Sequence, residues 1–248
     1  MHRVSVNVSD GLEKLLPRRL RSPVAVSAAD TATAVSIIED LGIPHTEVGS
    51  LSINGTPSPL TCRPADGDAL TVHPIRRAAA CDTAPPRFVL DVHLGKLARL
   101  LRLLGFDTTW SRDAGDAHLS ATAAREDRIL LSRDRGLLKR REVEKGCLVR
   151  SQNPRRQLDE VAERYGLYGR LAPFSRCLVC NAPLRLDAGA PSDRGAGGGS
   201  CPSCGRQYWR GSHWTALNAI VEEVRGGAGL PPSPHPRSRA AGPARCRA

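Results

Sequence analysis

Hydrophobic and polar positions follow two spacings along the middle of the chain. Phe88–Leu90 form a short apolar run, and leucines then recur at positions 94, 97, 101 and 104 before Gly105. The run predicts a buried strand, and the leucine spacing predicts a helix with one buried face that ends at Gly105. The pattern repeats, since residues 117–126 predict a second helix and residues 128–132 a second buried strand.

Strands that alternate with helices predict an α/β fold with a mostly parallel sheet. Such sheets bind ligands outside the carboxyl ends of their strands. Asp91 and Asp134 each come just after a predicted strand, and Asp116 precedes the second helix. Three crowded carboxylates repel one another, whereas an oxygen-preferring divalent cation attracts all three. We therefore expect Asp91, Asp116 and Asp134 to hold Mg²⁺ or Mn²⁺ and to be the catalytic residues.

Each aspartate also has a purely structural interpretation. Asp116 is well placed to be a helix N-cap, and Asp134-Arg135-Gly136 is a common turn composition. Asp91 lies between a buried strand and a helix, where an acidic side chain needs a specific partner. The three residues together favour a site more strongly than any one of them alone.

The first 77 residues show a different pattern. Val4, Val6 and Val8 alternate as in a strand, and a second strand is predicted at residues 24–26. Asp30 is placed to cap a helix that runs to Leu41 and stops at Gly42. Asn54-Gly55 predicts a hairpin, and residues 69–73 a closing strand. The order β-β-α-β-β predicts an α+β domain, which resembles the β-grasp fold of ubiquitin-like sulfur carriers such as ThiS and MoaD.

Sulfur carriers act through a free C-terminal Gly-Gly, and this sequence instead continues through His73-Pro74-Ile75-Arg76-Arg77. We therefore interpret residues 1–77 as a fused positioning or interaction module, with a protein partner as one possibility. Residues 78–86 are small and contain prolines, which predicts a linker.

Four of the eight cysteines form two C-x-x-C pairs, Cys177 with Cys180 and Cys201 with Cys204. Two such pairs, twenty residues apart, are typical of a structural zinc site with four thiolate ligands and no open position. A redox or disulfide role is the alternative. The remaining cysteines are scattered, which suits a reducing compartment and a cytoplasmic protein. The Gly-rich loop from Gly189 to Gly199 predicts disorder.

Three segments together carry a family resemblance: Arg87–Asp91, Leu94–Thr108 and Arg128–Arg135. They resemble the PIN-like ribonuclease family named after the C-terminal domain of a nematode mutator exonuclease, and Tyr208-Trp209 with Gly211-Ser212-His213 extends the likeness. The resemblance implies a PIN-type fold, a C-terminal zinc ribbon, a preceding β-grasp unit, and carboxylates that hold metal for RNA hydrolysis. It matches Asp91, Asp116 and Asp134 to the family's acidic residues. PIN nucleases often use a fourth acid, but only Ser151 and Asn153 follow the next predicted strand, residues 147–150.

The charge distribution favours a nucleic-acid substrate. The net charge is +11, residues 1–77 are balanced with eight basic and eight acidic residues, and residues 87–176 hold nineteen basic against twelve acidic. Basic side chains attract the phosphate backbone. Candidate RNA-binding residues are Lys96, Arg99, Arg133 and His213, and Arg102 extends the stripe of Lys96 and Arg99 along one helix face. A solvated basic surface is the alternative interpretation.

The expected organisation is a β-grasp domain at 1–77, a linker at 78–86, a PIN-like core at 87–170, a zinc ribbon with a terminal helix (214–224) at 171–225, and a disordered basic tail at 226–248. No apolar run is long enough to span a membrane. The leading functional hypothesis is a metal-dependent ribonuclease. A non-catalytic RNA-binding module and a protein-interaction adaptor are the alternatives.

Overall fold

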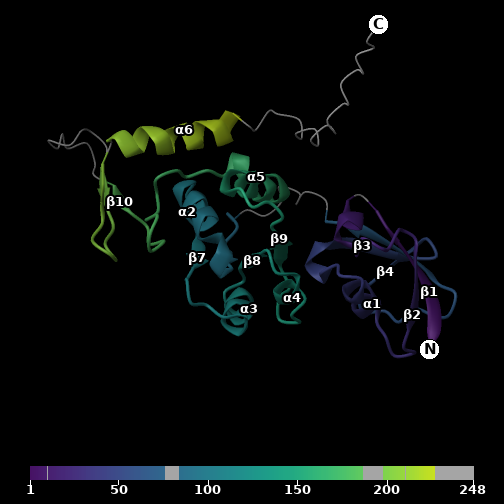
Figure 1. Cartoon of the computed structure of the whole chain (residues 1–248). Coiled ribbons are helices and arrows are strands. Elements are labelled where there is room, and N and C mark those ends of the chain that lie inside the picture. The colour runs from purple at the N-terminus through teal and green to yellow at the C-terminus, as the bar shows by residue number, and fades with distance from the viewer. Residues whose placement is uncertain (10, 76–83, 187–197, 210, 227–248) are drawn as a thin grey trace, which may run out of the picture.

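The computed structural model describes residues 1–9, 11–75, 84–186, 198–209 and 211–226 (Figure 1). Their strands form three sheets, with orders β2-β1-β5-β3-β4, β7-β6-β8-β9 and β10-β11-β12. The first sheet belongs to an N-terminal domain, the second to a central domain, and the third to a C-terminal ribbon. Among the described residues no helix has the length and apolar character that crossing a membrane requires.

The N-terminal domain is a mixed sheet covered by one helix and two short 3-10 helices. Its elements are β1 (His2–Val8), η1 (Leu12–Leu15), β2 (Val24–Ala28), α1 (Ala34–Asp40), η2 (His45–Glu47), β3 (Val48–Ile53), β4 (Thr56–Ser58) and β5 (Ala69–Pro74). Only β1 and β5 pair in parallel. The predicted hairpin is present, with positive φ at both Asn54 (50°) and Gly55 (81°).

Helix α1 begins later than the sequence suggested. Thr33, and not Asp30, is its N-cap, and Thr33 forms a capping box with Ser36. The carboxylate of Asp30 instead accepts a hydrogen bond from the amino terminus of Met1 at 3.1 Å. A threonine closer to the apolar stretch therefore takes the capping role.

The central domain has the predicted parallel sheet, and all of its strand pairs are parallel. Its elements are β6 (Phe88–Leu90), η3 (Val92–Leu94), α2 (Gly95–Leu103), β7 (Thr108–Trp110), α3 (Asp116–Arg125), β8 (Ile129–Ser132), α4 (Arg135–Leu138), β9 (Gly146–Leu148), α5 (Pro154–Tyr165) and η4 (Leu167–Gly169). Strand β7 was not predicted from the sequence, because two threonines and a tryptophan form no apolar run. Strand β9 begins one residue earlier than the predicted strand at residues 147–150 and also ends earlier.

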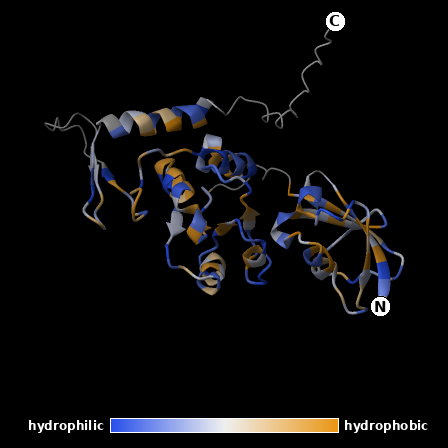
Figure 2. Ribbon diagram, in the orientation of Figure 1, coloured by the Kyte–Doolittle hydropathy of each residue, from blue (hydrophilic) through white to orange (hydrophobic). Residues whose placement is uncertain are grey.

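Phe88 lies at the centre of the core of the central domain. Its ring meets those of Phe106 and Tyr165 edge to face, with centroids 6.1 and 5.9 Å apart. The leucines predicted to line one helix face are all fully buried, at positions 94, 97, 101 and 104. Figure 2 shows hydrophobic colouring along α2 and along the N-terminal strands, beside hydrophilic segments. Burial of these apolar faces is the main favourable contribution to folding.

The C-terminal ribbon consists of β10 (Arg185–Leu186), β11 (Gly199–Ser200) and β12 (Gln207–Tyr208), and helix α6 (Ser212–Gly226) follows it. Val221 and Val224 of α6 are buried against the central domain. Gly199 lies in β11, so the predicted disordered loop ends before it. Most of that loop, most of the predicted linker and most of the predicted tail lie outside the described residues.

Replacing Gly105 by alanine should strongly destabilise the fold. Gly105 ends α2 with φ at +95°, and a Cβ there would lie 2.2 Å from the carbonyl oxygen of Ala172. We expect Gly105→Ala to cost about 3 kcal/mol or more, because left-handed strain and a backbone clash add together. Thermal or denaturant unfolding measures this cost.

Gly67→Ala is the matched control, because Gly67 also has a positive φ (+83°) but no atom lies within 4 Å of the place that an added Cβ would take. It should cost only about 1 kcal/mol. Equal losses in the two variants would contradict the role assigned to the close approach at Ala172.

Candidate active site and metal centre

Three neighbouring parallel strands lead to the three candidate aspartates. The strands β7, β6 and β8 are adjacent in the sheet, and their carboxyl ends lie at the same edge. Asp91 follows β6, Asp134 follows β8, and Asp116 begins α3 after the loop that leaves β7. The fold therefore brings all three to one edge of the sheet, where α/β proteins bind ligands.

Ser132 links Asp91 and Asp134 directly. Its hydroxyl donates a hydrogen bond of 2.7 Å to Oδ2 of Asp91 and accepts one of 2.9 Å from the backbone N–H of Asp134. Oδ1 of Asp91 accepts from the N–H of His93 at 2.8 Å. Asp91 is 4% exposed and Ser132 is fully buried. A buried carboxylate is thus held in one orientation at the end of β6.

Asp134 and Asp116 are both exposed, and they differ in their local roles. Asp134 is the N-cap of α4, and its Oδ1 accepts from the N–H of Gly136 at 2.7 Å. Asp134 thus has a structural role, as a helix N-cap where the sequence suggested a turn, and a cap retains lone pairs for a cation. Asp116 is the first residue of α3 and is not its N-cap, which is Gly115.

The three carboxylates do not form a closed metal cluster. Among the described residues, only the four ribbon cysteines bring at least three Cys, His, Asp or Glu ligand atoms within 4.8 Å of one another. Mg²⁺ commonly binds through one or two carboxylates and keeps several waters. A linked pair, Asp91 and Asp134, with an exposed third acid fits that type of site. Closer approach of three bare anions would be unfavourable.

Two further polar residues at this edge, Ser132 and Glu160, were not predicted from the sequence. Ser132 ends β8, and only its position between two aspartates in the fold gives it a role. Glu160 of α5 accepts from the N–H groups of Arg150 (2.8 Å) and Ser151 (3.0 Å), which brings an acid to the loop after β9. Burial raises the pKa of Glu160. Since backbone N–H groups engage both of its oxygens, Glu160 shapes this loop.

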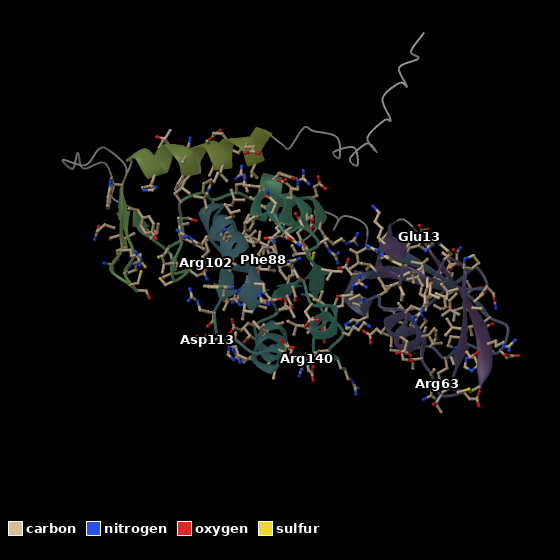
Figure 3. The ribbon with its side chains drawn as sticks, in the orientation of Figure 1. Glu13, Arg63, Phe88, Arg102, Asp113 and Arg140 are labelled. Carbon is tan, nitrogen blue, oxygen red and sulfur yellow. The ribbon has the colours of Figure 1, made fainter. Side chains whose placement is uncertain are left out.

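The loop before α3 adds another acid at the same edge. Asp113 is exposed in that loop, and Figure 3 shows it near the lower end of the central domain, as it does Arg140 after α4. Nε of Arg140 donates to the hydroxyl of Ser120 at 3.1 Å.

The ribbon cysteines form the second candidate centre. Sγ of Cys177 lies 3.6 Å from that of Cys204, and Sγ of Cys180 lies 3.4 Å from that of Cys201. A tetrahedral site with zinc–sulfur bonds of about 2.3 Å requires sulfur–sulfur separations of about 3.8 Å. Burial acts to raise the pKa of Cys177, but N–H donors and the Tyr208 hydroxyl outweigh it and lower this pKa to about 6. The four sulfurs fit a structural zinc ion.

Family models match both halves of the chain. The Mut7-C RNAse domain model matches residues 86–221, and the Mut7-C ubiquitin model matches residues 1–80. The chain belongs to the Mut7-C RNAse domain family. Searches for similar chains among curated proteins and among solved structures give no match.

In this Mut7-C protein, the match to the RNAse domain spans the parallel sheet, the three aspartates and the cysteine ribbon. The match to the ubiquitin domain spans the N-terminal sheet. We therefore refer below to the central domain as the RNAse domain and to the N-terminal domain as the ubiquitin-like domain.

Arg102 corrects one prediction about the basic helix face. It is 3% exposed, and so it does not extend the exposed positions Lys96 and Arg99. Its guanidinium donates to the carbonyls of Thr108 (2.9 Å), Leu178 (3.2 Å) and Val179 (2.7 Å). Burial lowers the pKa of Arg102. The reason lies in the fold, since the ribbon covers the last turn of α2, where Arg102 is labelled in Figure 3.

A cavity of about 360 Å³ lies between the ribbon and α6 of this Mut7-C protein. Four of its lining residues are aromatic: Phe174, Tyr208, Trp209 and Trp214. Phe174 and Trp214 stack, with centroids 5.8 Å apart, and Trp209 is 51% exposed. The predicted RNA-binding residue His213 also lines the cavity, whereas Lys96, Arg99 and Arg133 are exposed on the RNAse domain.

Zinc should be present at one ion per chain in protein purified without chelator, as measured by elemental analysis. Cys177→Ser should lower the free energy of unfolding by several kcal/mol, because structural zinc contributes folding free energy directly. Cys62→Ser is the control, since Cys62 lies outside the cluster. A purified protein without zinc would contradict this assignment.

Proposed function

We propose that this Mut7-C protein is a metal-dependent ribonuclease that hydrolyses RNA phosphodiester bonds. The observation that carries the proposal is the pair Asp91 and Asp134, which follow adjacent parallel strands. The buried hydroxyl of Ser132 donates to the carboxylate of Asp91 and accepts from the backbone N–H of Asp134. Two fixed carboxylates at the ligand-binding edge of an α/β sheet are the donor set that an oxygen-preferring divalent cation takes. The match to an RNAse domain family supports RNA as the substrate.

Each aspartate would have a distinct part in the reaction. Asp91, buried and oriented by two hydrogen bonds, would hold Mg²⁺ or Mn²⁺ in one place, and Asp134 would bind it from the start of α4. Asp116 would reach the site from the exposed start of α3. A bound divalent ion supplies an activated water and stabilises the charge that develops on the phosphate. Ser132 would hold the carboxylate of Asp91 and the backbone of Asp134 at a fixed distance from each other.

Basic side chains near the acidic edge would orient the RNA backbone. Arg133 lies between Ser132 and Asp134 in the chain, and Lys96 lies in the first turn of α2, five residues after Asp91. Arg99 is one turn further along the same helix, and all three are exposed. Phosphate contacts of this kind position a nucleic acid without reading its sequence.

The aromatic cavity beside the ribbon would bind unpaired bases. RNA-binding proteins commonly stack single-stranded bases on aromatic side chains. Trp209 and Tyr208 line this cavity together with His213, which would contact a phosphate or a base edge. The zinc ion would be structural, since four thiolates leave no position for substrate.

Free thiols such as Cys62 and Cys147 suit a reducing compartment, which supports action in the cytoplasm. Burial raises the pKa of Cys147 to about 12, so this thiol is unreactive.

Asp91→Asn and Asp134→Asn should each reduce RNA cleavage by a factor on the order of 100 or more, because each removes a negative charge from the metal site while keeping its size. Asp116→Asn should act in the same direction. The apparent affinity for Mn²⁺ should fall together with cleavage. The thermal unfolding midpoint without metal should stay near that of the wild type, because asparagine caps and turns almost as well as aspartate.

Asp127→Asn is the matched control, since Asp127 is an exposed aspartate at the opposite, amino end of β8 and has a positive φ (49°) that asparagine tolerates. Wild-type cleavage by Asp91→Asn and Asp134→Asn would defeat the nuclease proposal. A wild type that binds RNA but cleaves none with Mg²⁺ or Mn²⁺ would identify a binding module instead.

Trp209→Ala should weaken binding of single-stranded RNA by about tenfold, because one base loses its stacking platform. Fluorescence anisotropy with a labelled single-stranded RNA measures this change. Val179→Ala is the control, since Val179 is an exposed apolar residue of the ribbon outside the cavity. If Trp209→Ala and the wild type bind single-stranded RNA with equal affinity, Trp209 does not stack on a base.

A further inference from the structure

The ubiquitin-like domain contacts the turn that carries Asp134. Nη1 of Arg135, the residue after Asp134, donates to the carbonyl of Leu15 at 2.6 Å and to that of Gly42 at 3.4 Å. Leu15 ends η1, and Gly42 follows the end of α1. Carbonyls at helix ends lack partners within their own helix and carry partial negative charge. The cation of Arg135 therefore meets two acceptors that the other domain leaves open.

Helix α4 depends on such contacts because it is only four residues long (Arg135–Leu138). So short a helix is not stable alone in water. Leu137 and Leu138 are buried in a hydrophobic cluster that includes Leu12, Leu15 and Ile43 of the ubiquitin-like domain. Lys139, four residues after Arg135, donates to the carbonyl of Glu39 in α1. One face of α4 is thus fixed by the neighbouring domain.

A second group of contacts holds the same two domains together at β9. Glu47 is 3% exposed, and its carboxylate accepts from Nη1 of Arg164 at 2.9 and 3.0 Å and from the N–H of Leu148 at 2.8 Å. β9 is the edge strand of the parallel sheet, and Glu47 accepts a backbone hydrogen bond from Leu148 of this strand. Nε2 of His45 contacts the carbonyl of Val143 at 2.7 Å. The two domains are docked through buried polar and apolar groups.

We propose that Arg135 is a positioning residue, through which the docked ubiquitin-like domain holds Asp134 in its place in the acidic site. The inference rests on the proposed ribonuclease function for its activity readout. Asp134 lies between two fixed points, since its N–H bonds to Ser132 on the sheet side and Arg135 bonds to Leu15 and Gly42 on the domain side. Loss of the hydrogen bonds from Arg135 to Leu15 and Gly42 would make α4 more mobile, and with it the carboxylate of its N-cap, Asp134.

The geometry separates this role from direct RNA binding. The guanidinium of Arg135 is directed at carbonyls of the other domain, and the residue is partly buried, whereas Arg133 is exposed. A positioning residue acts on the turnover rate and on metal affinity. If Arg135 contacted RNA directly, its replacement would instead raise the KM for RNA and make that KM less dependent on salt.

The test compares Arg135→Met with the wild type in the full chain, because methionine keeps the apolar stem and removes the donor. We expect kcat for RNA cleavage to fall about tenfold with KM changed less than about twofold, and the Mn²⁺ affinity to fall by a similar factor. Amide hydrogen exchange should speed up at residues 134–139. Arg135→Lys should restore part of kcat, since one donor and the charge return.

Two further variants control for charge and for folding. Lys145→Met removes one positive charge from an exposed residue at the other end of the sheet and should leave kcat unchanged. Gly42→Ala approaches the contact from the ubiquitin-like domain, since φ at Gly42 is +91° and an alanine there strains the backbone whose carbonyl accepts from Arg135. The added Cβ itself makes only an ordinary contact, 3.4 Å from Nη1 of Arg135. This variant should lower kcat and speed exchange at residues 134–139 without any change in the RNAse domain. It tests the contact even if Arg135→Met does not fold.

Unchanged exchange at residues 134–139 and unchanged kcat in Arg135→Met would overturn the proposal, and so would a rise in KM with kcat unchanged. If the wild type cleaves no RNA, the proposed function fails, and hydrogen exchange together with Mn²⁺ titration still decides the positioning role. Faster exchange and weaker Mn²⁺ binding in Arg135→Met would support it in that case, and wild-type values of both would end it.

Discussion

Parallel pairing of β6 with β7 on one side and with β8 on the other is the constraint on which the candidate acidic site depends. Parallel strands all end at the same edge, so residues that leave three neighbouring strands lie along one edge of the sheet although they are far apart in sequence. Asp91 and Asp134 are 43 positions apart in the chain, yet Ser132 bonds to both. An antiparallel β8 would have placed Asp134 at the opposite edge.

Glu47 and Arg164 show what kind of interface joins the two domains. Removing two charges from water is costly, and their attraction offsets the cost only where the geometry is good and further hydrogen bonds are made. Here Arg164 also donates to the carbonyls of Thr46 and Gly146, at 2.8 and 3.1 Å. Such a cluster adds specificity more than stability, since its bonds form in one docked arrangement, and within the described residues Nε of Arg164 is buried without a hydrogen-bond partner. A protein partner of the ubiquitin-like domain would therefore bind away from η1, η2 and the end of α1.

The sequence predicted what depends on local spacing. The leucine repeat, aspartates that follow apolar runs, the Asn54-Gly55 turn and the paired cysteines all indicated their elements, because each signal lies within a few residues. It did not reveal the position of Arg102, since the ribbon that buries Arg102 comes about 75 residues later. The roles of Ser132 and Glu47 were missed for the same reason, because both depend on partners from distant segments. Strand β7 was missed because its threonines pair in the sheet without forming an apolar run.

Arg102 and Tyr208 tie the zinc ribbon into the core of the RNAse domain. Arg102 of α2 bonds to carbonyls beside Cys177 and Cys180, and the Tyr208 hydroxyl contacts Sγ of Cys177 at 3.1 Å and accepts from the N–H of Leu178 at 3.1 Å. A ligand that binds only the folded state increases the folded fraction by mass action. If the four cysteines bind zinc, the free zinc concentration becomes a thermodynamic variable for the whole RNAse domain, and the amount of folded domain follows the zinc supply of its surroundings.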